Sequence, residues 1–527
     1  MTTRFERIAL VGLPGAGKST VARLLADRLG WACADTDSEV AAVAGRDPAW
    51  VIEHDGEAAF RRLELEALRR IVAGPTPVVI ACGGGLVAQP DSARLLTGVA
   101  DVVWLDAPDA VLLHRLGDGL GRPLLAPDPV QRLAALRAER SRAYGVAHLC
   151  VAADAPAADV AGRIAAVVGS SVSVDAASAS YRVEVRSGAV DDVSLHLPPG
   201  AARVAVVADQ AVRRPCRRIM SQLKREGRAV SLIAMRGGER VKTWQSAGRL
   251  LARLGDAGVR RSDCVVAVGG GSVGDLAGFA AATHLRGVAW INVPSTLLAM
   301  VDSAIGGKTG VNLARGKNLA GAIWQPRAVI CDPDLLAGLP VRQYRAALAE
   351  VVKYSMVFGD GLVDVLDRHL EALLARDPER LTDVIRRSIE AKARTVAEDE
   401  RESGPRALLN YGHTVGHALE TATDYSAVLN HGEAVAVGMR VAGALSVAQL
   451  GCPGDDIAWQ DSVLERCGLG RAPSVPVRRV MAAISSDKKQ TAGGTGWVLL
   501  ESRGSACYGQ LVPEHLVEAE LRRVLPG

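Results

Sequence analysis

Paired cysteines are absent from this sequence, and their absence excludes two kinds of stabilised fold. The nine cysteines occur singly, without a CxxC pair. A disulfide framework or a zinc site built from thiolates would need paired or clustered cysteines. We therefore expect a protein of a reducing compartment whose domains are held by apolar cores, as the 49% hydrophobic content allows.

Features of nucleic-acid-binding and membrane proteins are also missing. The net charge is only +4 over 527 residues, and no lysine-rich run is present, which argues against a nucleic-acid partner. No uninterrupted apolar run is long enough to span a bilayer, and "MTTRFER" passes directly into the strand-like "IALVGL" without room for a signal peptide. We expect a cytoplasmic protein that acts on small molecules, without a membrane partner.

The chain is too long for one ordinary hydrophobic core, so two or three domains are expected. The segment "GSSVSVDAASAS" is small and polar, which is typical of a flexible linker. We predict an N-terminal domain over residues 1–168, a linker over 169–180 and a larger C-terminal part. The C-terminal part divides into an α/β domain over 181–340 and a mainly helical domain over 341–527.

A phosphate-binding loop opens the N-terminal domain. An apolar strand, a glycine-rich turn and an amphipathic helix follow one another in "RIALVGLPGAGKSTVARLLADRLG", and residues 12–19 fit GxxxxGK[ST]. Backbone N–H groups of such a loop cradle phosphates, while Lys18 reaches the β- and γ-phosphates and Ser19 gives a hydroxyl to Mg²⁺. A glycine turn that binds nothing is a weaker interpretation, because strand, loop and helix occur together. The predicted ATP contacts are Gly15, Ala16, Gly17, Lys18, Ser19 and Thr20.

Polar residues and glycines that suit a phosphoryl acceptor follow in separate segments. The segment "ADTDSE" places two aspartates at the end of a second parallel strand, near the phosphates. In "FRRLE", Arg61 and Glu64 lie one helical turn apart. The glycines of "ACGGGLV" let a substrate approach the backbone closely, and further arginines occur in "GRPLL" and "RSRAY". Taken singly, Arg61 or Arg140 could equally be a solvated helix charge.

Together these motifs resemble shikimate kinase over nearly all of the N-terminal domain. The resemblance implies a doubly wound parallel sheet and ATP-dependent phosphorylation of shikimate, mostly by positioning and charge neutralisation. It implies that Asp37 orients or deprotonates the attacking hydroxyl. Asp35 would support Mg²⁺ with Ser19, and Arg122 would act as a lid arginine on ATP. The implied shikimate contacts are Asp37, Arg61, Gly83, Gly84, Gly85 and Arg140.

One departure from this family concerns the nucleotide base. The family usually carries an arginine near the adenine after its last strand, whereas "AADAPAAD" has none. A nucleotide-sensing domain without catalysis is the alternative interpretation. The complete "GKS", "DTD", "FRRLE" and "GRPLL" elements argue against it.

A second glycine turn lies in the C-terminal part. A buried strand, a glycine turn and a helix form "DCVVAVGGGSVGDLAGF", without the Lys-Ser/Thr of a phosphate loop. Such a turn exposes backbone donors to a pyrophosphate and suits a dinucleotide, although tight packing of strand on helix also explains such glycines. The predicted NAD contacts in and before this turn are Asp209, Glu239, Lys242, Gly269, Gly270, Gly271, Ser272, Val273 and Asp275.

Polar residues are unusually dense in the next segment, "VPSTLLAMVDSAIGGKTGVNLARGKN", and no core needs them. Asp302, Lys308, Lys317 and Asn318 suit a pocket for an anionic, hydroxylated ligand. From about Val341 the sequence becomes helical.

Three candidate metal ligands lie in this helical region. They are Glu350 in "AEVVKY", His413 in "NYGHTVGHALE" and His431 in "HGEAVAVG". Three ligands from three segments leave a coordination position open, as in catalytic rather than structural zinc sites. His413 and His417 share a helical face, so their spacing by itself also allows both to bind one metal. A third histidine ligand would close the open position.

The C-terminal motifs resemble 3-dehydroquinate synthase over nearly all of residues 181–527, through "GGGSVGDLAGF", "VPSTLLAMVDSAIGGKTGVN", "GKN", "AEVVKY", "LNYGHTVGHALE", "HGEAVAVG" and "DKK". The resemblance implies NAD-dependent and zinc- or cobalt-dependent cyclisation of 3-deoxy-arabino-heptulosonate 7-phosphate. An alcohol is oxidised by hydride transfer, phosphate is eliminated, the ketone is reduced again, and ring opening precedes an aldol step. NAD⁺ is regenerated in each turnover.

The same resemblance implies roles for individual residues. Zinc would be held by Glu350, His413 and His431, whereas His417 would be an acid or base near the proton removed during elimination. Lys353 and Asp302 complete the implied catalytic set. Further implied NAD contacts are Ser295, Thr296, Asp302, Lys308 and Lys317. Implied substrate contacts are Arg286, reaching across a dimer interface, together with Asp302, Lys308, Asn318, Lys353, Lys392, Arg406, Asn410, His417, Lys488 and Lys489.

Two departures and two alternatives accompany this resemblance. Ser295 replaces the usual threonine of "VPST", and Gly338 replaces a threonine near the cofactor. A zinc-dependent polyol dehydrogenase would not need so many cations, whereas a cyclase acting on sedoheptulose 7-phosphate would share most of the pocket. We expect a homodimer through the synthase part that carries two kinase domains on flexible linkers. The two reactions belong to one pathway but are not adjacent in it, so the fusion does not by itself imply channelling.

Overall fold

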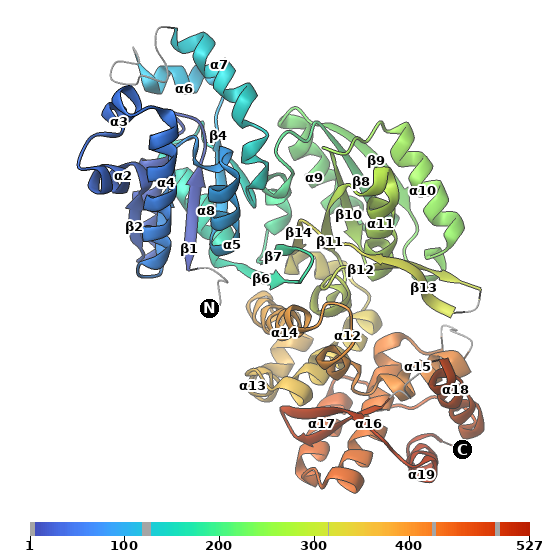
Figure 1. Ribbon diagram of the computed structural model, residues 1–527. Coiled ribbons are helices and arrows are strands. Elements are labelled where there is room, and N and C mark those ends of the chain that lie inside the picture. The colour runs from blue at the N-terminus through green and yellow to red at the C-terminus, as the bar shows by residue number, and fades with distance from the viewer. Residues whose placement is uncertain (1–5, 118–127, 315, 424–427, 491–495, 527) are drawn as a thin grey trace.

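A computed structural model describes residues 6–117, 128–314, 316–423, 428–490 and 496–526, and of residues 486–490 it describes the backbone alone. Figure 1 shows an N-terminal α/β part in blue, a second α/β part in green and yellow, and a helical part in orange and red. The first part contains a five-stranded parallel sheet in the order β2-β3-β1-β4-β5. The predicted doubly wound parallel sheet is therefore present.

The elements of this first part follow one another as expected for alternating strands and helices. Its strands are β1 (Arg7–Val11), β2 (Ala32–Asp35), β3 (Val78–Ala81), β4 (Asp101–Asp106) and β5 (Leu149–Ala152). Its helices are α1 (Lys18–Leu29), α2 (Thr36–Ala44), α3 (Pro48–His54), α4 (Glu57–Ala73), α5 (Pro90–Val99), α6 (Asp109–Leu116), α7 (Pro129–Arg140) and α8 (Ala157–Gly169), with short helices η1 (Leu86–Ala88) and η3 (Ala143–Val146). Strands β1, β3 and β4 are mostly apolar and buried, whereas the edge strand β2 is partly exposed, so the core lies between the centre of the sheet and its helices.

The second sheet has seven strands in the order β6-β7-β14-β11-β10-β8-β9, parallel except for the β6–β7 pair. They are β6 (Ser171–Asp175), β7 (Ser180–Val185), β8 (Arg203–Asp209), β9 (Ala229–Met235), β10 (Cys264–Gly269), β11 (Ala289–Pro294) and β14 (Ala328–Cys331). The main helices are η4 (Ala189–His196), α9 (Arg213–Arg225), α10 (Trp244–Asp256) and α11 (Gly271–Thr283). An antiparallel hairpin of β12 (Lys308–Leu313) and β13 (Gly316–Ile323) extends from this domain.

The predicted flexible linker over 169–180 is wrong for much of its length. Helix α8 ends at Gly169, and β6 begins at Ser171 as the first strand of the second sheet. Alternation in "SVSVD" puts Val172 and Val174 on one face, where both are buried, and α14 packs against this strand. A composition of small polar residues concealed a period-two pattern. The two parts of the chain are therefore joined directly, without a loose connector between α8 and β6.

The helical part begins with α12, which starts at the predicted Val341. Its helices are α12 (Val341–Phe358), α13 (Leu362–Leu374), α14 (Pro378–Glu398), η10 (Pro405–Asn410), α15 (His413–Ala422), α16 (His431–Leu450), α17 (Gly454–Arg466), α18 (Val477–Gln490) and α19 (Glu514–Val524). A hairpin of β15 (Trp497–Ser502) and β16 (Ser505–Gln510) interrupts them. Helix α16 is long and apolar enough to cross a membrane by length and composition, but 61% of its most apolar window is buried. A core helix of a globular domain passes the same test.

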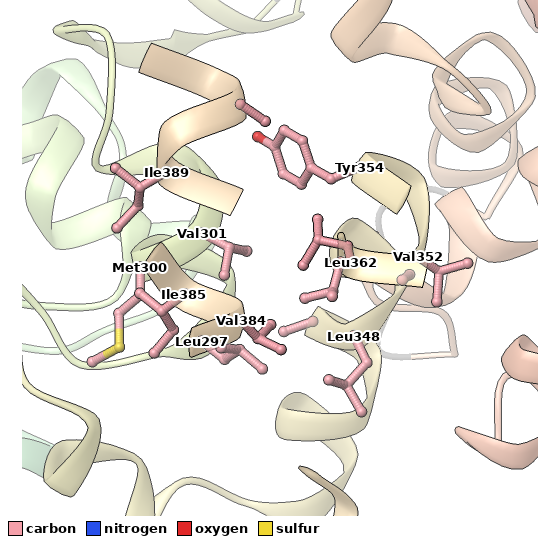
Figure 2. Close-up of a cluster of buried hydrophobic side chains, with 14 of the residues drawn as sticks. Leu297, Met300, Val301, Leu348, Val352, Tyr354, Leu362, Val384, Ile385 and Ile389 are labelled. Carbon is pink, nitrogen blue, oxygen red and sulfur yellow. The ribbon is translucent and has the colours of Figure 1, made fainter. Parts of the chain in front are cut away.

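One apolar cluster fixes α12 against the α/β domain. Figure 2 shows side chains of α12, α13 and α14 converging on the segment that follows β11. The labelled members are Leu297, Met300, Val301, Leu348, Val352, Tyr354, Leu362, Val384, Ile385 and Ile389. Burial of such side chains stabilises the contact by about 1.5–3 kcal/mol each. The cluster thereby holds α12, which carries Glu350 and Lys353, at the boundary between the two domains.

Candidate active sites

Three helices bring the predicted metal ligands together. Glu350 lies in α12, while His413 and His431 are the first residues of α15 and α16. The Nε2 atoms of His413 and His431 lie 3.7 Å and 3.6 Å from Oε1 of Glu350. The candidate ligand atoms of the three residues all lie within 4.8 Å of one another. This spacing suits three ligands around one divalent cation.

Two glycines of α16 allow these helices to approach so closely. A Cβ atom at Gly432 would lie 2.0 Å from the carbonyl oxygen of Ala346 in α12. A Cβ atom at Gly438 would lie 1.9 Å from the carbonyl oxygen of Gly412, the residue before His413. Real Cβ atoms essentially never make contacts shorter than 3.0 Å, so only glycine fits at either position. The spacing of the ligands therefore depends on the glycines of "HGEAVAVG".

The ligands are oriented as a metal site requires. Nδ1 of His413 lies 3.2 Å from the carbonyl oxygen of Tyr411, and Nδ1 of His431 lies 3.5 Å from Oε2 of Glu420. Partners of this kind on Nδ1 direct Nε2 toward a metal. Oε1 of Glu350 is buried and has no hydrogen-bond partner among the residues that the structure describes. The donor set therefore fits a cation such as Zn²⁺ or Co²⁺.

The pKa values of the two histidines shift in opposite directions. Burial, followed by the charge of Lys353, lowers the pKa of His413 to about 3. Burial also opposes protonation of His431, but the nearby carboxylates of Glu350 and Glu420 outweigh it and raise the pKa of His431 to about 10. His413 is therefore neutral near pH 7, whereas a cation must displace a proton from His431.

His417 lies beside this ligand group rather than within it. Its ring centroid is 5.3 Å from that of His413 and 6.0 Å from that of His431, and its side chain is exposed. Its possible ligand atoms group with Glu420 and His431 instead. The group with Glu350 uses Nε2 of His431, which faces Glu350. The group with His417 and Glu420 uses Nδ1 of the same ring, which faces Glu420. The geometry therefore separates His417 from the Glu350 group.

A cavity of about 520 Å³ lies between the second α/β domain and the helical domain, with His413 in its wall. The β12–β13 hairpin forms one side, and residues of α14 and η10 contribute to the other. Nine predicted site residues line it: Asp275, Asp302, Lys308, Asn318, Lys353, Lys392, Arg406, Asn410 and His413. Four of these are cations from separate segments, so the cavity suits an anionic ligand.

Asp302 orients one of these basic side chains, Lys392, and lies in a short π-helix, Ala299–Ser303. Nζ of Lys392 donates to Oδ1 of Asp302 at 2.6 Å, and the hydroxyl of Tyr354 donates to the same oxygen at 3.0 Å. Although burial opposes ionisation, Lys392 and Lys353 hold the pKa of Asp302 well below its usual range. Burial lowers the pKa of Lys392. An ionised carboxylate therefore fixes Lys392 at the cavity wall.

In the first α/β part, the predicted phosphate loop joins β1 to α1. Nζ of Lys18 donates to the carbonyl oxygens of Gly12 and Leu13 at 3.0 Å and 3.2 Å. Oγ of Ser19 donates to Oδ2 of Asp35 at 2.7 Å. The two predicted Mg²⁺ residues are thus in direct contact, close to the start of α1, where the helix dipole favours phosphate.

The predicted acceptor residues surround the glycines 83–85 that follow β3. A Cβ atom on the first of these glycines would lie 2.9 Å from Oδ1 of Asp37. One on the second would lie 3.3 Å from Nη1 of Arg140, and one on the third would lie 2.5 Å from Nη1 of Arg61. The Nε atoms of both arginines are buried without hydrogen-bond partners among the described residues. Tyr144, which the sequence reasoning missed, donates to the carbonyl oxygen of the middle glycine at 2.7 Å. Two guanidinium groups therefore face a space kept open by glycine.

Family models match both parts of the chain. One described as shikimate kinase matches residues 14–168, and those described as 3-dehydroquinate synthase N-terminal and C-terminal match residues 232–346 and 347–490. A 3-dehydroquinate synthase of Halorhodospira halophila is 44% identical over 353 residues, which cover 67% of this chain and 99% of that relative. The chain belongs to the 3-dehydroquinate synthase family and carries a shikimate kinase domain.

Two solved structures resemble the synthase part. A 2-deoxy-scyllo-inosose synthase complexed with carbaglucose-6-phosphate, NAD⁺ and Co²⁺ has a TM-score of 0.61 at 28% identity, covering 67% of this chain and 100% of its own. A 2-epi-5-epi-valiolone synthase from Streptomyces hygroscopicus subsp. jinggangensis, with NAD⁺ and Zn²⁺ bound, has a TM-score of 0.61 at 26% identity, covering 66% and 97%. The synthase part therefore shares the architecture of these enzymes.

The predicted NAD residues of the synthase part gather near the carboxyl ends of β8 and β10. Chain order reverses between these adjacent strands, the position at which α/β sheets bind dinucleotides. Nζ of Lys242 donates to Oδ2 of Asp275 and to Oδ1 of Asn318, both at 2.6 Å. Oγ of Ser272 donates to Oε2 of Glu239 at 3.1 Å. These bonds connect the predicted dinucleotide residues to the lining of the cavity.

The glycine turn 269–271 of the synthase part is closely surrounded. Its first glycine would place a Cβ atom 2.7 Å from Cβ of Val273, and its third would place one 2.6 Å from Oγ of Ser303. The hydroxyl oxygen of Ser303 is buried without a partner among the described residues. Close packing against Val273 and Ser303 therefore requires glycine at the first and third positions of the turn. Three other predicted contacts lie beside the turn or at the end of β8: Ser295, Thr296 and Asp209.

Glu402 of the synthase part lines the cavity, but the sequence reasoning missed it. Its carboxylate forms an ion pair with Lys308 and accepts a hydrogen bond from Nδ2 of Asn410 at 3.1 Å. Burial opposes ionisation, but Lys308 and this amide lower the pKa of Glu402. Its segment, "AEDERESG", contains five charged residues, and no spacing rule selects one of them.

Glu420 was also missed, although its position offered a signal. It follows His417 by three residues and so shares that helical face. Besides contacting His431, it accepts a hydrogen bond from Nζ of Lys317 at 3.3 Å. Lys317, predicted to contact NAD, therefore reaches the residue that orients a metal ligand.

One predicted residue is not brought to these sites, and three others lie outside what the structure describes. Arg286 is exposed in η7 (His284–Arg286) and does not line the cavity. Arg122 lies outside the described residues, and so do the side chains of Lys488 and Lys489. Their roles stay predictions.

Proposed function

We propose that this chain phosphorylates shikimate with ATP and Mg²⁺, and cyclises 3-deoxy-arabino-heptulosonate 7-phosphate to 3-dehydroquinate with NAD and Zn²⁺ or Co²⁺. The observation that carries the second activity is the meeting of Glu350, His413 and His431 beside a cavity lined by four cations. Relatives named 3-dehydroquinate synthase reach 44% identity, well above the 28% and 26% of the two other cyclases. This difference favours the heptulosonate over sedoheptulose 7-phosphate.

The residues around the cavity suit binding and proton transfer. When bound, NAD would remove and later return a hydride, and the metal would polarise the reacting alcohol. Lys353, Lys392 and Arg406 would bind the carboxylate, hydroxyls and phosphate of the substrate. His417 would exchange the proton lost during elimination, in part through the substrate's own phosphate. Because these three cations are buried, their charge interactions with a bound anion would be stronger than in water.

The kinase residues suit transfer of a phosphoryl group to a hydroxyl. Lys18 would leave its carbonyl partners for the β- and γ-phosphates, and the contact between Ser19 and Asp35 marks where Mg²⁺ would be held. Asp37 would orient the attacking hydroxyl. Arg61 and Arg140 would bind the carboxylate and hydroxyls of shikimate, which supplies partners for their buried Nε atoms.

Separate assays test the two activities. Phosphate release from the heptulosonate phosphate and from sedoheptulose 7-phosphate is compared in the presence of NAD and metal. Phosphate release from sedoheptulose 7-phosphate alone would refute the synthase proposal. For the kinase, ATP consumption with shikimate is measured in the parent and in Lys18→Ala, and equal rates would refute it.

We further propose a homodimer formed through the synthase part. Arg286 supports this proposal because it is exposed and lies outside the cavity of its own chain, so a substrate contact would have to be made in a second subunit. Sedimentation tests the assembly, and a strict monomer at assay concentration would refute it. A cytoplasmic location stays a prediction.

A further inference from the structure

The kinase sheet ends at β5, and the synthase part covers that edge. Helix η4 of the synthase packs beside β5, and Leu195 of η4 is 2% exposed within the apolar core of the kinase. An uncovered edge strand leaves backbone groups unpaired and is easily loosened. The synthase therefore contributes a side chain to the core of the kinase domain.

Polar contacts fix this interface at several points. Nη2 of Arg327 donates to the carbonyl oxygen of Ala147, just before β5, at 2.5 Å. Nη2 of Arg163 in α8 lies 3.3 Å from Oδ1 of Asp192 in η4. Arg182 in β7 forms an ion pair with Asp101 at the start of β4, and both side chains are only 6% exposed. Because Arg182 and Asp101 belong to different parts and are both buried, removing either partner would leave a buried charge without its counterion.

The interface lies beside the loop that follows β5. A cavity of about 340 Å³ has a kinase wall that includes Ala152 and Asp154 and a synthase wall that includes Leu195 and Arg228. On the kinase side, Nη1 of Arg115 in α6 donates to the carbonyl oxygen of Ala153 at 2.7 Å. The loop is thus held between α6 and the cavity next to the synthase.

Helix α6 in turn contacts the phosphate loop. A Cβ atom at Gly15 would lie 2.9 Å from the carbonyl oxygen of Leu112 in α6. Contacts therefore run from the phosphate loop through α6 and Arg115 to the loop after β5, and from there to the synthase. No synthase residue needs to touch the nucleotide for the synthase to influence where these groups lie.

We propose that the synthase part positions the nucleotide side of the kinase part, with Leu195 as a positioning residue. The proposal rests on the proposed kinase function. The direct joint between α8 and β6 fixes the relative position of the two parts, and the interface fixes β5 and the loop after it. Loosening the interface is expected to weaken ATP binding while leaving Asp37, Arg61 and the glycines 83–85, which lie around β3 on the other side of β1, in place.

The test compares full-length variants by hydrogen–deuterium exchange and steady-state kinetics. Leu195→Ala removes the contact, Leu195→Met retains its volume, and Leu223→Ala is a matched truncation in α9 that is buried in the synthase core alone. We expect exchange at residues 149–156 to be about tenfold faster in Leu195→Ala than in the parent. The KM for ATP should rise several-fold with the KM for shikimate unchanged. Leu195→Met should resemble the parent, and Leu223→Ala should leave residues 149–156 protected.

Exchange does not depend on kinase activity, so the two proposals fail separately. Absence of shikimate phosphorylation in the parent would refute the proposed kinase activity. It would not refute the proposal that the synthase part positions the nucleotide side of the kinase part. The inference would be overturned if residues 149–156 of Leu195→Ala exchanged hydrogen as slowly as those of the parent. It would also be overturned if Leu223→Ala accelerated exchange at these residues as much as Leu195→Ala does. Leu195→Val is a smaller truncation that allows the same comparison if the alanine variant does not fold.

Discussion

Gly438→Ala should separate the metal ligands without altering any of them. The new methyl group would lie 1.9 Å from the carbonyl oxygen of Gly412, whereas ordinary contact begins at 3.4 Å. Helices α15 and α16 must therefore move apart by about 1.5 Å at this point, the difference between the two distances. Metal–ligand distances tolerate only about 0.2 Å. Because His413 directly follows Gly412, its Nε2 atom should leave the reach of a cation held by Glu350 and His431.

Both metal affinity and stability should report this displacement. We expect Zn²⁺ affinity to fall by at least about 10–100-fold, the loss typical of disturbed ligand orientation, and stability to fall by about 1–3 kcal/mol through overpacking. Competition with a chromogenic chelator measures the first, and thermal unfolding of the metal-free protein measures the second. Gly454→Ala is the control, because a Cβ atom there meets nothing within 4 Å. Parental Zn²⁺ affinity in Gly438→Ala would refute the argument that close helix packing sets the ligand geometry.

Three further predictions concern the ligands themselves. His413→Ala should lose bound metal, whereas His417→Ala should retain it and lose turnover; metal analysis showing an empty site in both would instead indicate a chelating pair. Glu420→Gln should weaken metal binding by about 10–100-fold through loss of the carboxylate that orients His431, and a chelator competition with unchanged affinity would contradict this. Burial opposes protonation of His431, but Glu350 and Glu420 raise its pKa to about 10, so the metal-free site is protonated below that pH. Metal binding should therefore release a proton, and apparent affinity should rise about tenfold per pH unit between about pH 6.5 and about pH 8.5; pH-independent titrations would exclude it.

Local motifs determined much of this protein in advance. The phosphate loop needs only consecutive backbone donors with Lys18 and Ser19, and these follow from a strand, a turn and a helix adjacent in the chain. The glycine turn 269–271 and the ligand set of Glu350, His413 and His431 were identified by residue type and spacing for the same reason. The phosphate loop and the glycine turn are each specified by one short segment, whereas the three ligand residues meet only through the packing of α12, α15 and α16.

Tertiary structure decided the features that depend on long-range packing. Glu402 is one of several charges in its segment, and only the fold brings this segment, between α14 and η10, to Lys308 at the start of β12. Residues 171–175 looked like a linker because the sheet and α14, which bury Val172 and Val174, lie elsewhere in the sequence. Leu195 belongs by sequence to the synthase and by burial to the kinase core. Composition and spacing indicate which structure and chemistry a segment is suited to. Which distant residues it contacts depends on the free energy of packing the whole chain.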